Sequence, residues 1–218
     1  MADIKAAYKF SKDIYDDTLT QNRWWSKLYI SLFWGGVDDM EIAKKVLNMI
    51  PDHFKGKMLD VPVGTGVFTV RKYKALHQAD ITCLDYSDDM LRLSSKRFKD
   101  MGLSNISCVQ GDVGNLKYKD GTFDVLLSMN GFHAFPDKER AFSETVRVLK
   151  SGGTFCGCFY IKGKNKASDF IVKSFLSKKG WFTPPFYTFE ELSNKLNSLY
   201  SNVEIFSEQS ISYFKCIK

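Results

Sequence analysis

Short apolar runs alternate with amphipathic helical segments from about residue 57 to the end of this 218-residue chain. The apolar runs predict strands near 57–61, 80–85, 105–110, 122–129, 153–160, 202–208 and 211–217. Segments with helical periodicity lie between them, near 66–78, 88–101, 137–150, 165–179 and 189–200. Because strands separated by helices pair through right-handed crossovers, we expect an α/β fold with a doubly wound, mostly parallel seven-stranded sheet.

The C-terminal sequence VEIFSEQSISYFKCIK departs from this alternation. It contains two strand patterns whose connection is too short for a crossover helix, so the last two strands must be antiparallel. Local start signals support the helices, since Ser87 precedes two aspartates at one helix start and Thr188 with Glu191 makes a capping box at another. The sheet is therefore expected to close with an antiparallel C-terminal strand.

The composition is that of a globular protein with one core. Hydrophobic residues make up 44% and charged residues 26% of the sequence, which excludes a disordered chain and favours a single domain over residues 1–218. The aromatic run WWSKLYISLFW is too short to cross a bilayer and no secretory signal is recognised, so a cytoplasmic location is expected. The five cysteines fall in apolar, strand-like segments and are expected to be reduced thiols, and no metal site is predicted.

The first 34 residues carry eight aromatic side chains, a density above the 15% of the whole chain. Trp25, Tyr29 and Phe33 recur every four residues, which is typical of one face of a helix. We expect residues 1–50 to form an aromatic-rich helical N-terminal cap that acts as a lid over a ligand site. Plain core packing and a membrane-surface or partner helix are the alternatives.

The turn after the first predicted strand reads LDVPVGTG and ends at Gly66. Gly64 and Gly66 allow the backbone to approach a ligand closely, and the following helix presents free N–H groups. This spacing alone is a weak signal, because dinucleotide-binding reductases use nearly the same one. Asp60 argues against a dinucleotide, since its carboxylate would repel a pyrophosphate and attract a cationic ligand.

Two further acidic residues end the next two predicted strands. Asp85 closes the second strand in ITCLDYSDDM, where a carboxylate can accept both hydroxyls of a ribose. Asp112 follows the third strand in VQGDVGNL, where it can accept from an adenine amine while the backbone N–H of Val113 serves a ring nitrogen. We expect these acids to form one ligand-binding edge with Asp60, although each of them also suits an ordinary loop or helix start.

Five ordered motifs, LDVPVGTG, CLDYSDDML, GDVGNL, GTFDVLLSMNGFHAF and RVLKSGGTF, resemble those of the class I S-adenosylmethionine-dependent methyltransferases. The resemblance extends over about residues 40–160 and is strongest to the small-molecule type of quinone biosynthesis. It implies a Rossmann-like methyltransferase fold, S-adenosylmethionine as the cofactor and a small-molecule methyl acceptor. The antiparallel final pair of strands also matches this family.

The resemblance assigns a role to each residue of the predicted ligand-binding edge. The implied contacts are Asp60, Val61, Pro62, Gly64 and Gly66 for the methionine part, Asp85 for the ribose, Tyr86 and Met90 beside the rings, Asp112 and Val113 for the adenine, and Met129 and Asn130 near the methionine end. Pro62 stands where the family usually has its first glycine. That position therefore lacks an N–H that could contact the cofactor.

Methyl transfer from a sulfonium needs an in-line approach in a water-poor pocket, and a general base for some acceptors only. His133 is the candidate base, with Tyr8 and Tyr15 as others, although a loop histidine also suits a packing role. The stretch KKGWFTPPFYTF, together with NGFHAF, predicts a pocket for an apolar or aromatic acceptor. The alternative for this stretch is a loop that its aromatic rings hold against the core.

The net charge is +6, and residues 150–179 carry seven lysines against one acid, Asp169. A solvated helix face is the default explanation, with an acidic substrate, peripheral contact with an anionic membrane and nucleic acid as alternatives. Nucleic acid is the least favoured, because SMNGFH lacks the N-P-P-Y type signature of base-amine methyltransferases. A small-molecule methyltransferase is favoured over a cofactor-binding protein without turnover and over a nicotinamide-dependent oxidoreductase.

Overall fold

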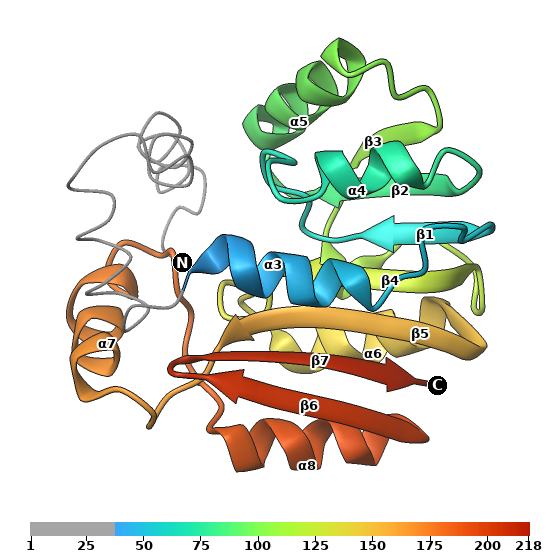
Figure 1. Ribbon diagram of the computed structural model, residues 1–218. Coiled ribbons are helices and arrows are strands. Elements are labelled where there is room, and N and C mark those ends of the chain that lie inside the picture. Colours follow the sequence, from blue (N-terminus) through green and yellow to red (C-terminus); the bar gives the residue numbers. More distant parts are fainter. Residues whose placement is uncertain (1–37) are drawn as a thin grey trace.

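The computed structural model describes residues 38–218, which form a seven-stranded sheet with helices on both faces (Figure 1). The strands are β1 (Lys57–Asp60), β2 (Asp80–Asp85), β3 (Ile106–Gln110), β4 (Phe123–Met129), β5 (Leu149–Tyr160), β6 (Asn202–Glu208) and β7 (Ile211–Ile217). The α-helices are α3 (Asp39–Asn48), α4 (Val70–Ala75), α5 (Asp88–Asp100), α6 (Lys138–Val148), α7 (Lys166–Ile171) and α8 (Phe189–Leu199). A 3-10 turn, η1 (Val113–Asn115), and a π-helical turn, η2 (Val172–Leu176), complete the elements.

The strand order is β3-β2-β1-β4-β5-β7-β6, and β1 to β5 are parallel. β7 pairs antiparallel with both β5 and β6, which confirms the expected antiparallel end of the sheet. The chain moves outward from β1 through β2 to β3 and then crosses back to β4 on the other side of β1. In open α/β sheets, ligands bind at such a reversal, outside the carboxyl ends of the strands.

The predicted helix start signals are present in the structure. Ser87 accepts a hydrogen bond from the backbone N–H of Met90 at the start of α5, and Thr188 and Glu191 form the reciprocal capping box of α8. Asp137, which no start signal had singled out, caps α6 in the same way as Ser87 caps α5. These caps satisfy backbone donors that a helix leaves without partners, so the sequence sets these boundaries locally.

The structure differs from the predicted elements at three places. The first crossover helix begins at Val70 instead of residue 66, because Gly64 and Gly66 have positive φ values of +57° and +70°, outside the helical region. α6 ends at Val148 and β5 begins directly at Leu149, four residues before the predicted start. The helix expected over 165–179 consists of α7 followed by the π-helical turn η2.

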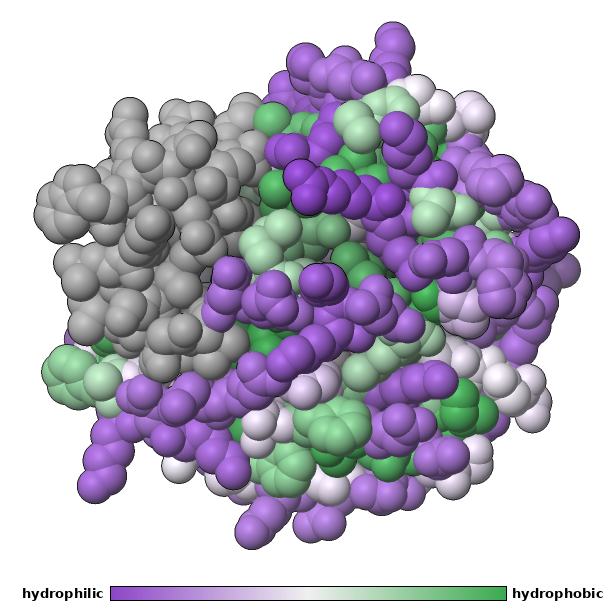
Figure 2. Space-filling model, viewed as in Figure 1, coloured by the Kyte–Doolittle hydropathy of each residue, from purple (hydrophilic) through white to green (hydrophobic). Residues whose placement is uncertain are grey.

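The core lies in two layers, one on each face of the sheet. One layer packs α3, α4 and α5 against the sheet and includes Tyr73 and Phe98, and the other packs α6 and α8 and includes Phe142 and Phe155. The five cysteines are free thiols. Hydrophilic side chains cover most of the described surface visible in Figure 2. Across residues 38–218, no helix combines the length and the apolar character that a membrane span requires.

The predicted cap over residues 1–50 overlaps the described residues only in part. Its C-terminal portion forms α3, an amphipathic helix that Asp38 caps and that packs with Ile42 and Val46 on the core. The aromatic residues on which the lid prediction depends lie outside the described residues, as do Tyr8 and Tyr15. The lid and the single-domain assignment stay predictions.

Candidate functional site

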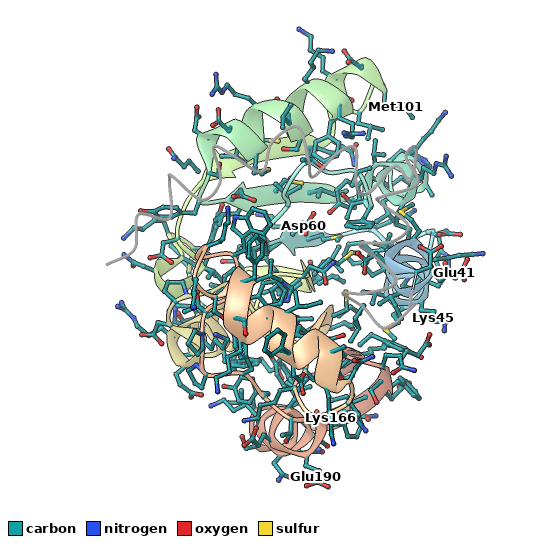
Figure 3. The ribbon with its side chains drawn as sticks, turned by 90° about the vertical axis from the view of Figure 1, so that its left-hand side faces the viewer. Glu41, Lys45, Asp60, Met101, Lys166 and Glu190 are labelled. Carbon is teal, nitrogen blue, oxygen red and sulfur yellow. The ribbon has the colours of Figure 1, made fainter. Side chains whose placement is uncertain are left out.

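The predicted ligand-binding residues gather at the carboxyl edge of the sheet, around the reversal between β1 and β4. Figure 3 looks onto this edge and places Asp60 near the middle of the sheet. Asp60 ends β1 and pairs in register with Cys83 of β2 and Leu127 of β4. Asp85 ends the neighbouring β2, and Asp112 follows β3, so three successive parallel strands each deliver an acid to one edge.

The loop after β1 has the backbone conformation that its two glycines predict. Gly64 and Gly66 both adopt left-handed φ values, and a Cβ placed on Gly64 would meet no atom within 4 Å. A Cβ on Gly66 would lie 2.7 Å from Cζ of Phe98, so Gly66 also permits close packing on α5. Gly64 therefore borders open space, and Gly66 fixes the loop against the helix behind it.

Pro62 packs closely against a glycine that sequence analysis did not select. The Val61–Pro62 peptide bond is cis, and a Cβ on Gly131 would lie 2.3 Å from Cδ of Pro62. Gly131 is the second residue after β4, and the absence of a Cβ there lets the backbone of the two loops approach closely. The loops after β1 and β4 thus touch at the reversal point.

Asp85 holds the loop of residues 61–66 in place through a hydrogen bond. Its Oδ2 accepts a hydrogen bond of 2.9 Å from the backbone N–H of Gly64, and its Oδ1 accepts one of 2.9 Å from Ser87. The side chain is buried, and this burial raises the pKa of Asp85 although the backbone donors act in the opposite direction. Each carboxylate oxygen has a second lone pair, so the same group retains acceptor capacity for a ligand hydroxyl.

Asp60 is a buried acid with one hydrogen-bonded and one unpaired oxygen. The hydroxyl of Tyr73 donates to Oδ2 over 2.6 Å, while Oδ1 has no hydrogen-bond partner among the described residues. Burial raises the pKa of Asp60 to about 7, and the nearby charge of Asp85 raises it further, while the bond from Tyr73 lowers it. An unpaired buried carboxylate oxygen is costly, and a cationic ligand would relieve that cost.

Buried hydroxyl oxygens without partners also lie in the adjoining segments. Within residues 38–218 they include Oγ1 of Thr65, in the loop after β1, and Oγ of Ser128, near the end of β4. Together with Oδ1 of Asp60, they give this edge unused polar atoms from the loop and from two neighbouring strands. Such a set suits a polar ligand at the point of chain reversal.

The turn after β3 is also ordered by its acid. Asp112 caps η1 by accepting a hydrogen bond of 2.8 Å from the backbone N–H of Gly114, and its side chain is exposed. Val113 is buried, so the structure places its side chain in the core and leaves only its backbone for a ligand. Tyr86 is 52% exposed, whereas Met90 is buried, so these two residues differ in their access to a ligand ring.

Met129 and Asn130 lie across the reversal from this turn. Asn130 has a left-handed φ of +54°, and its backbone N–H donates to the carbonyl of Cys158 over 2.7 Å. Met129 is buried at the end of β4. The twelve predicted cofactor residues therefore lie at one sheet edge, in the strand ends, the turns after them and the first turn of α5, although Val61, Met90, Val113 and Met129 are buried in the protein core.

His133 is held by packing and by a backbone donor. The backbone N–H of Tyr160 approaches its Nδ1 at 3.3 Å, and the ring stacks on Phe182 with centroids 4.0 Å apart. Burial lowers the pKa of His133 to about 3, with the charge of Lys138 acting in the same direction. Because Nδ1 accepts this hydrogen bond, the proton of the neutral ring is on Nε2, which leaves no free lone pair for proton abstraction. The geometry favours the packing role that the sequence left open.

The aromatic stretch after η2 also packs inward. Phe182 is buried and makes edge contacts with Tyr160 and Phe186, at centroid distances of 5.6 and 6.3 Å. Tyr187 donates from its hydroxyl to Glu139 of α6. Trp181, Phe186 and Tyr187 are partly buried, so these rings hold the loop on the core while keeping some exposed surface.

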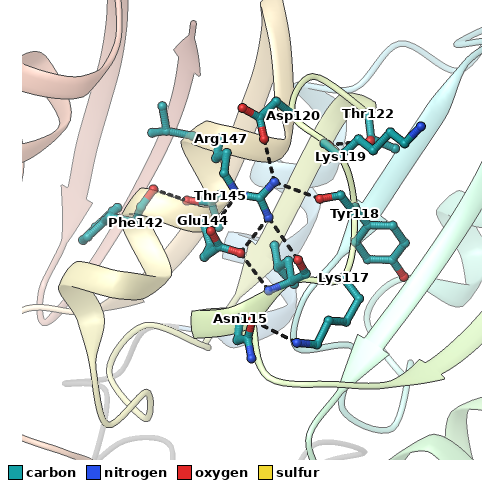
Figure 4. A network of polar contacts seen from close by, with 12 residues as sticks. Asn115, Lys117, Tyr118, Lys119, Asp120, Thr122, Phe142, Glu144, Thr145 and Arg147 are labelled. Atoms are coloured by element: carbon teal, nitrogen blue, oxygen red, sulfur yellow. Dashed lines mark hydrogen bonds and ion pairs between the residues drawn. The ribbon is translucent and has the colours of Figure 1, made fainter.

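An arginine that no sequence motif indicates orders the segment following η1 (Figure 4). Arg147 of α6 donates to the carbonyls of Leu116 and Tyr118 and pairs with Glu144 and Asp120, all at 2.7 to 3.0 Å. Glu144 in turn accepts from the backbone N–H of Leu116. This network anchors the chain just after Asp112. Its partners are 3 to 31 residues apart in sequence, so no short motif reveals it.

Three comparisons place this geometry among known proteins. A family described as "Methyltransferase domain" matches residues 58–153. A demethylmenaquinone methyltransferase of Thermotoga maritima is 33% identical over 165 residues, which cover 72% of this chain and 69% of that protein. A 2-methyl-6-phytyl-1,4-hydroquinone methyltransferase of Oryza sativa is 28% identical over 149 residues, and the match covers 68% of this chain but only 40% of the rice protein.

A solved structure shows the same fold. The crystal structure of a SAM-dependent methyltransferase from Thermotoga maritima superposes with a TM-score of 0.68 and 17% sequence identity, covering 97% of this chain and 99% of that one. At this identity the likeness concerns the fold alone. Within the described residues, no group of three or more histidine, cysteine or acidic side chains is arranged to hold a metal ion.

Proposed function

Because this chain belongs to the S-adenosylmethionine-dependent methyltransferases, we propose that it transfers the sulfonium methyl group of that cofactor to a small apolar or aromatic acceptor by in-line displacement. The family relationship rests on the Thermotoga relative, and the motifs in LDVPVGTG and CLDYSDDML agree with it. The activity of the whole protein remains a proposal, since the chain spans between 40% and 69% of the two relatives' lengths.

The unpaired oxygen of Asp60 is the observation that carries the proposal. S-adenosylmethionine is cationic at its sulfonium and at its amino group, so it supplies the positive charge and the donors that a buried carboxylate needs. A nicotinamide dinucleotide would bring its anionic pyrophosphate to the glycine loop, beside Asp60 and Asp85. The electrostatics of this edge therefore favour the methyl donor.

The residues of this chain bind and orient the reactants. Asp85 would accept from the ribose hydroxyls, Asp112 and the backbone of Val113 would receive the adenine, and the loop from Val61 to Gly66 would contact the methionine part. When bound, the cofactor supplies a methyl group on a good leaving group. An acceptor atom forms the new bond to the methyl carbon as the carbon–sulfur bond breaks, and that electron pair stays on sulfur. The enzyme's part is alignment and exclusion of water.

Two observations support an apolar or aromatic acceptor. The Thermotoga and rice relatives are named for quinone-related substrates. In this chain, Trp181 and Phe186 keep part of their surface exposed beside the buried Phe182. The packing of His133 leaves no base among the predicted residues that the structure describes, which agrees with an acceptor that needs none, such as a carbanion-like ring carbon.

The expected cytoplasmic location stays a prediction.

Calorimetric titration tests the cofactor assignment. The purified protein is titrated with S-adenosylhomocysteine, NADH and NADPH, with Asp85→Ala as the comparison variant. We expect S-adenosylhomocysteine to bind and both nicotinamides not to bind. Its affinity should be lower in the variant, because the acceptor for the ribose hydroxyls and the hydrogen bond to the backbone N–H of Gly64 are both lost. Binding of a nicotinamide, or of neither ligand class, would overturn the proposal.

The acceptor is tested separately with radiolabelled methyl transfer to a panel of apolar aromatic compounds, quinols included. We expect transfer to at least one quinol-like ring and none to polar amines. Binding of S-adenosylhomocysteine without transfer to any member of the panel would point instead to a cofactor-binding protein without turnover.

A further inference from the structure

Exposed phenylalanines and lysines share one surface formed by α7, η2 and the turns beside them. Phe170 is 71% exposed and Phe175 is 53% exposed, the two highest values among the exposed large hydrophobic residues described. The surrounding exposed residues are lysines, apart from Gly163 and Ala167. We call this surface the α7 face and define it by Lys164, Lys166, Phe170, Lys173, Phe175, Lys178 and Lys179.

The π-helical turn brings the two phenylalanines toward the same side. In a continuous α-helix, residues five apart point about 140° away from each other. In η2 the chain makes a wider turn, in which the backbone N–H of Ser177 bonds to the carbonyl of Val172 five residues earlier, over 2.9 Å. Phe170 lies in α7 and Phe175 in η2, where the smaller rotation per residue brings Phe175 closer to the side of Phe170 than a continuous α-helix would. Ser168, Val172 and Leu176 are buried on the opposite side.

The charge of the α7 face is almost entirely positive. Residues 162–179 contain six lysines and one acid, Asp169. Asp169 is engaged within the protein, since it accepts from the hydroxyl of Tyr160 over 2.5 Å and from the backbone N–H of Gly163 over 2.9 Å. Lys162 pairs with Glu191 at 3.2 Å and is not counted in the face. The Nζ of Lys179 lies 5.2 Å from the ring centre of Phe175, so charge and aromatic surface adjoin.

The α7 face lies at the same end of the molecule as the candidate site. α7 follows the carboxyl end of β5, and Figure 1 shows it beyond the strand ends on the side toward which β1 and β5 point. Figure 3 looks onto this end and shows α7, with Lys166 labelled, in front of the sheet edge that carries Asp60. Where α7 reaches the visible surface in Figure 2, hydrophobic and hydrophilic residues lie side by side.

We propose that the α7 face binds the surface of an anionic lipid bilayer. Aromatic rings on an otherwise cationic surface are the features that place a segment at the boundary of headgroups and acyl chains. Lysines near the membrane are attracted to anionic headgroups, and that attraction complements the +6 net charge of the chain. Binding through this face would turn the carboxyl edge of the sheet toward the bilayer, so an apolar acceptor in the membrane would lie near the site.

Vesicle co-sedimentation of the full chain tests the proposal without any methyl acceptor or cofactor. Vesicles of phosphatidylcholine alone are compared with vesicles that contain about one third phosphatidylglycerol. We expect partitioning onto the anionic vesicles to exceed partitioning onto neutral ones about tenfold or more, and to fall when the salt concentration rises from about 0.1 M to about 1 M.

Two double variants separate the contributions of rings and charges. Phe170→Ser with Phe175→Ser and Lys166→Gln with Lys173→Gln should each lower partitioning onto anionic vesicles about tenfold. The control for the rings is Phe206→Ser, at a ring 47% exposed on β6. The control for the charges is Lys74→Gln with Lys99→Gln, at exposed lysines of α4 and α5. Both control variants should bind vesicles as the wild type does. Circular dichroism spectra and thermal unfolding midpoints equal to those of the wild type verify the folding of all four variants.

Three results would overturn the proposal. They are equal partitioning onto neutral and anionic vesicles, unchanged partitioning of both α7 variants, and self-association of the wild type that Phe170→Ser with Phe175→Ser abolishes. The last result would identify a second copy of the chain as the occupant of the α7 face. Because the assay reads lipid binding alone, the proposed methyl transfer can fail without affecting this test.

Discussion

The hydroxyl of Tyr73 donates a hydrogen bond of 2.6 Å to Oδ2 of Asp60, and both side chains are buried. Burial and the adjacent carboxylate raise the pKa of Tyr73 well above its ordinary value, so the phenol remains a donor. With Oδ2 engaged in this way, Oδ1 is the unpaired oxygen. Tyr73 thereby orients the acid that we assign to the cationic part of the cofactor.

Tyr73→Phe should weaken the site through Asp60. Loss of the donor leaves a second buried oxygen unpaired, which costs about 1–3 kcal/mol in the free energy of unfolding. It also removes an interaction that lowers the pKa of Asp60, so a smaller fraction of the acid is ionised near neutral pH. We expect the affinity for S-adenosylhomocysteine at pH 7 to fall about tenfold by calorimetry.

The control for this substitution is Tyr213→Phe on β7, whose hydroxyl makes a long 3.3 Å bond to Glu208 of β6, the strand at one edge of the sheet. That variant should bind S-adenosylhomocysteine as the wild type does. Equal affinities of Tyr73→Phe and Tyr213→Phe would show that Tyr73 does not position Asp60.

Asp60 should also make the free energy of unfolding depend on pH, with stability falling as the pH rises. Its pKa is about 7 in the folded protein and 3.8 in the reference state, so the folded state binds the proton more tightly. The resulting stabilisation is complete below pH 3.8 and is lost as the pH rises through 7, up to about 4 kcal/mol in total. Asp60→Asn does not titrate and should lack this loss.

Urea unfolding of both proteins at several pH values between about 4 and 8 measures the difference. We expect the wild type to lose stability relative to Asp60→Asn as the pH rises across this range. Binding of S-adenosylhomocysteine should show the opposite trend in the wild type, weakening below pH 7 as the carboxylate is protonated. Parallel stability curves of the two proteins would contradict the raised pKa.

His133→Asn should separate packing from catalysis at His133. The asparagine oxygen can replace Nδ1 as the acceptor for the backbone N–H of Tyr160, but the stack on Phe182 is lost. We expect a loss of about 1–2 kcal/mol in stability and a kcat within about threefold of the wild type. A kcat lowered a hundredfold or more, together with a changed pH–rate profile, would show that His133 acts as a base.

The lowered pKa of His133 should make the free energy of unfolding fall as the pH falls. Its value in the folded protein is about 3, against 6.5 in the reference state, so the folded state binds this proton less tightly. The associated stability is present above pH 6.5 and is lost as the pH falls toward 3, opposite in direction to the contribution of Asp60. The acid limb of the wild-type stability curve should therefore flatten in His133→Asn.

Local signals predicted most of the fold and the outline of the site. Strand periodicity, the capping residues Ser87 and Thr188, and the short link between β6 and β7 each act within a few residues. The two glycines of the loop after β1 were predicted because a close backbone approach requires a residue without a Cβ, and both have the left-handed φ that only glycine adopts readily.

The features that escaped prediction join distant parts of the chain. Asp85 reaches Gly64 across 21 residues, and Arg147 reaches the carbonyl of Leu116 across 31. The burial of His133 depends on Phe182, which follows it by 49 positions. Such pairs leave no periodic trace, since each depends on how strands and loops meet in three dimensions.

Gly131 supplies the sharpest test of how the loops after β1 and β4 meet. In Gly131→Ala the new methyl group would lie 2.3 Å from Cδ of Pro62, 2.8 Å from Cζ of Phe135 and 2.9 Å from Oγ of Ser128. A proline ring cannot move without its backbone, so the loop that carries Gly64 must shift. We expect a loss of about 2–4 kcal/mol in stability and at least a tenfold loss of affinity for S-adenosylhomocysteine.

Gly152→Ala is the matched control for this variant. Gly152 has a left-handed φ of +73°, and an added Cβ would meet no atom within 4 Å, so the substitution brings backbone strain of about 1 kcal/mol without a clash. It lies in β5, at the end of the sheet opposite the site, and should leave the affinity unchanged. If Gly131→Ala lost no more stability or affinity than Gly152→Ala, the contact between Pro62 and Gly131 would not hold the loop after β1 in place.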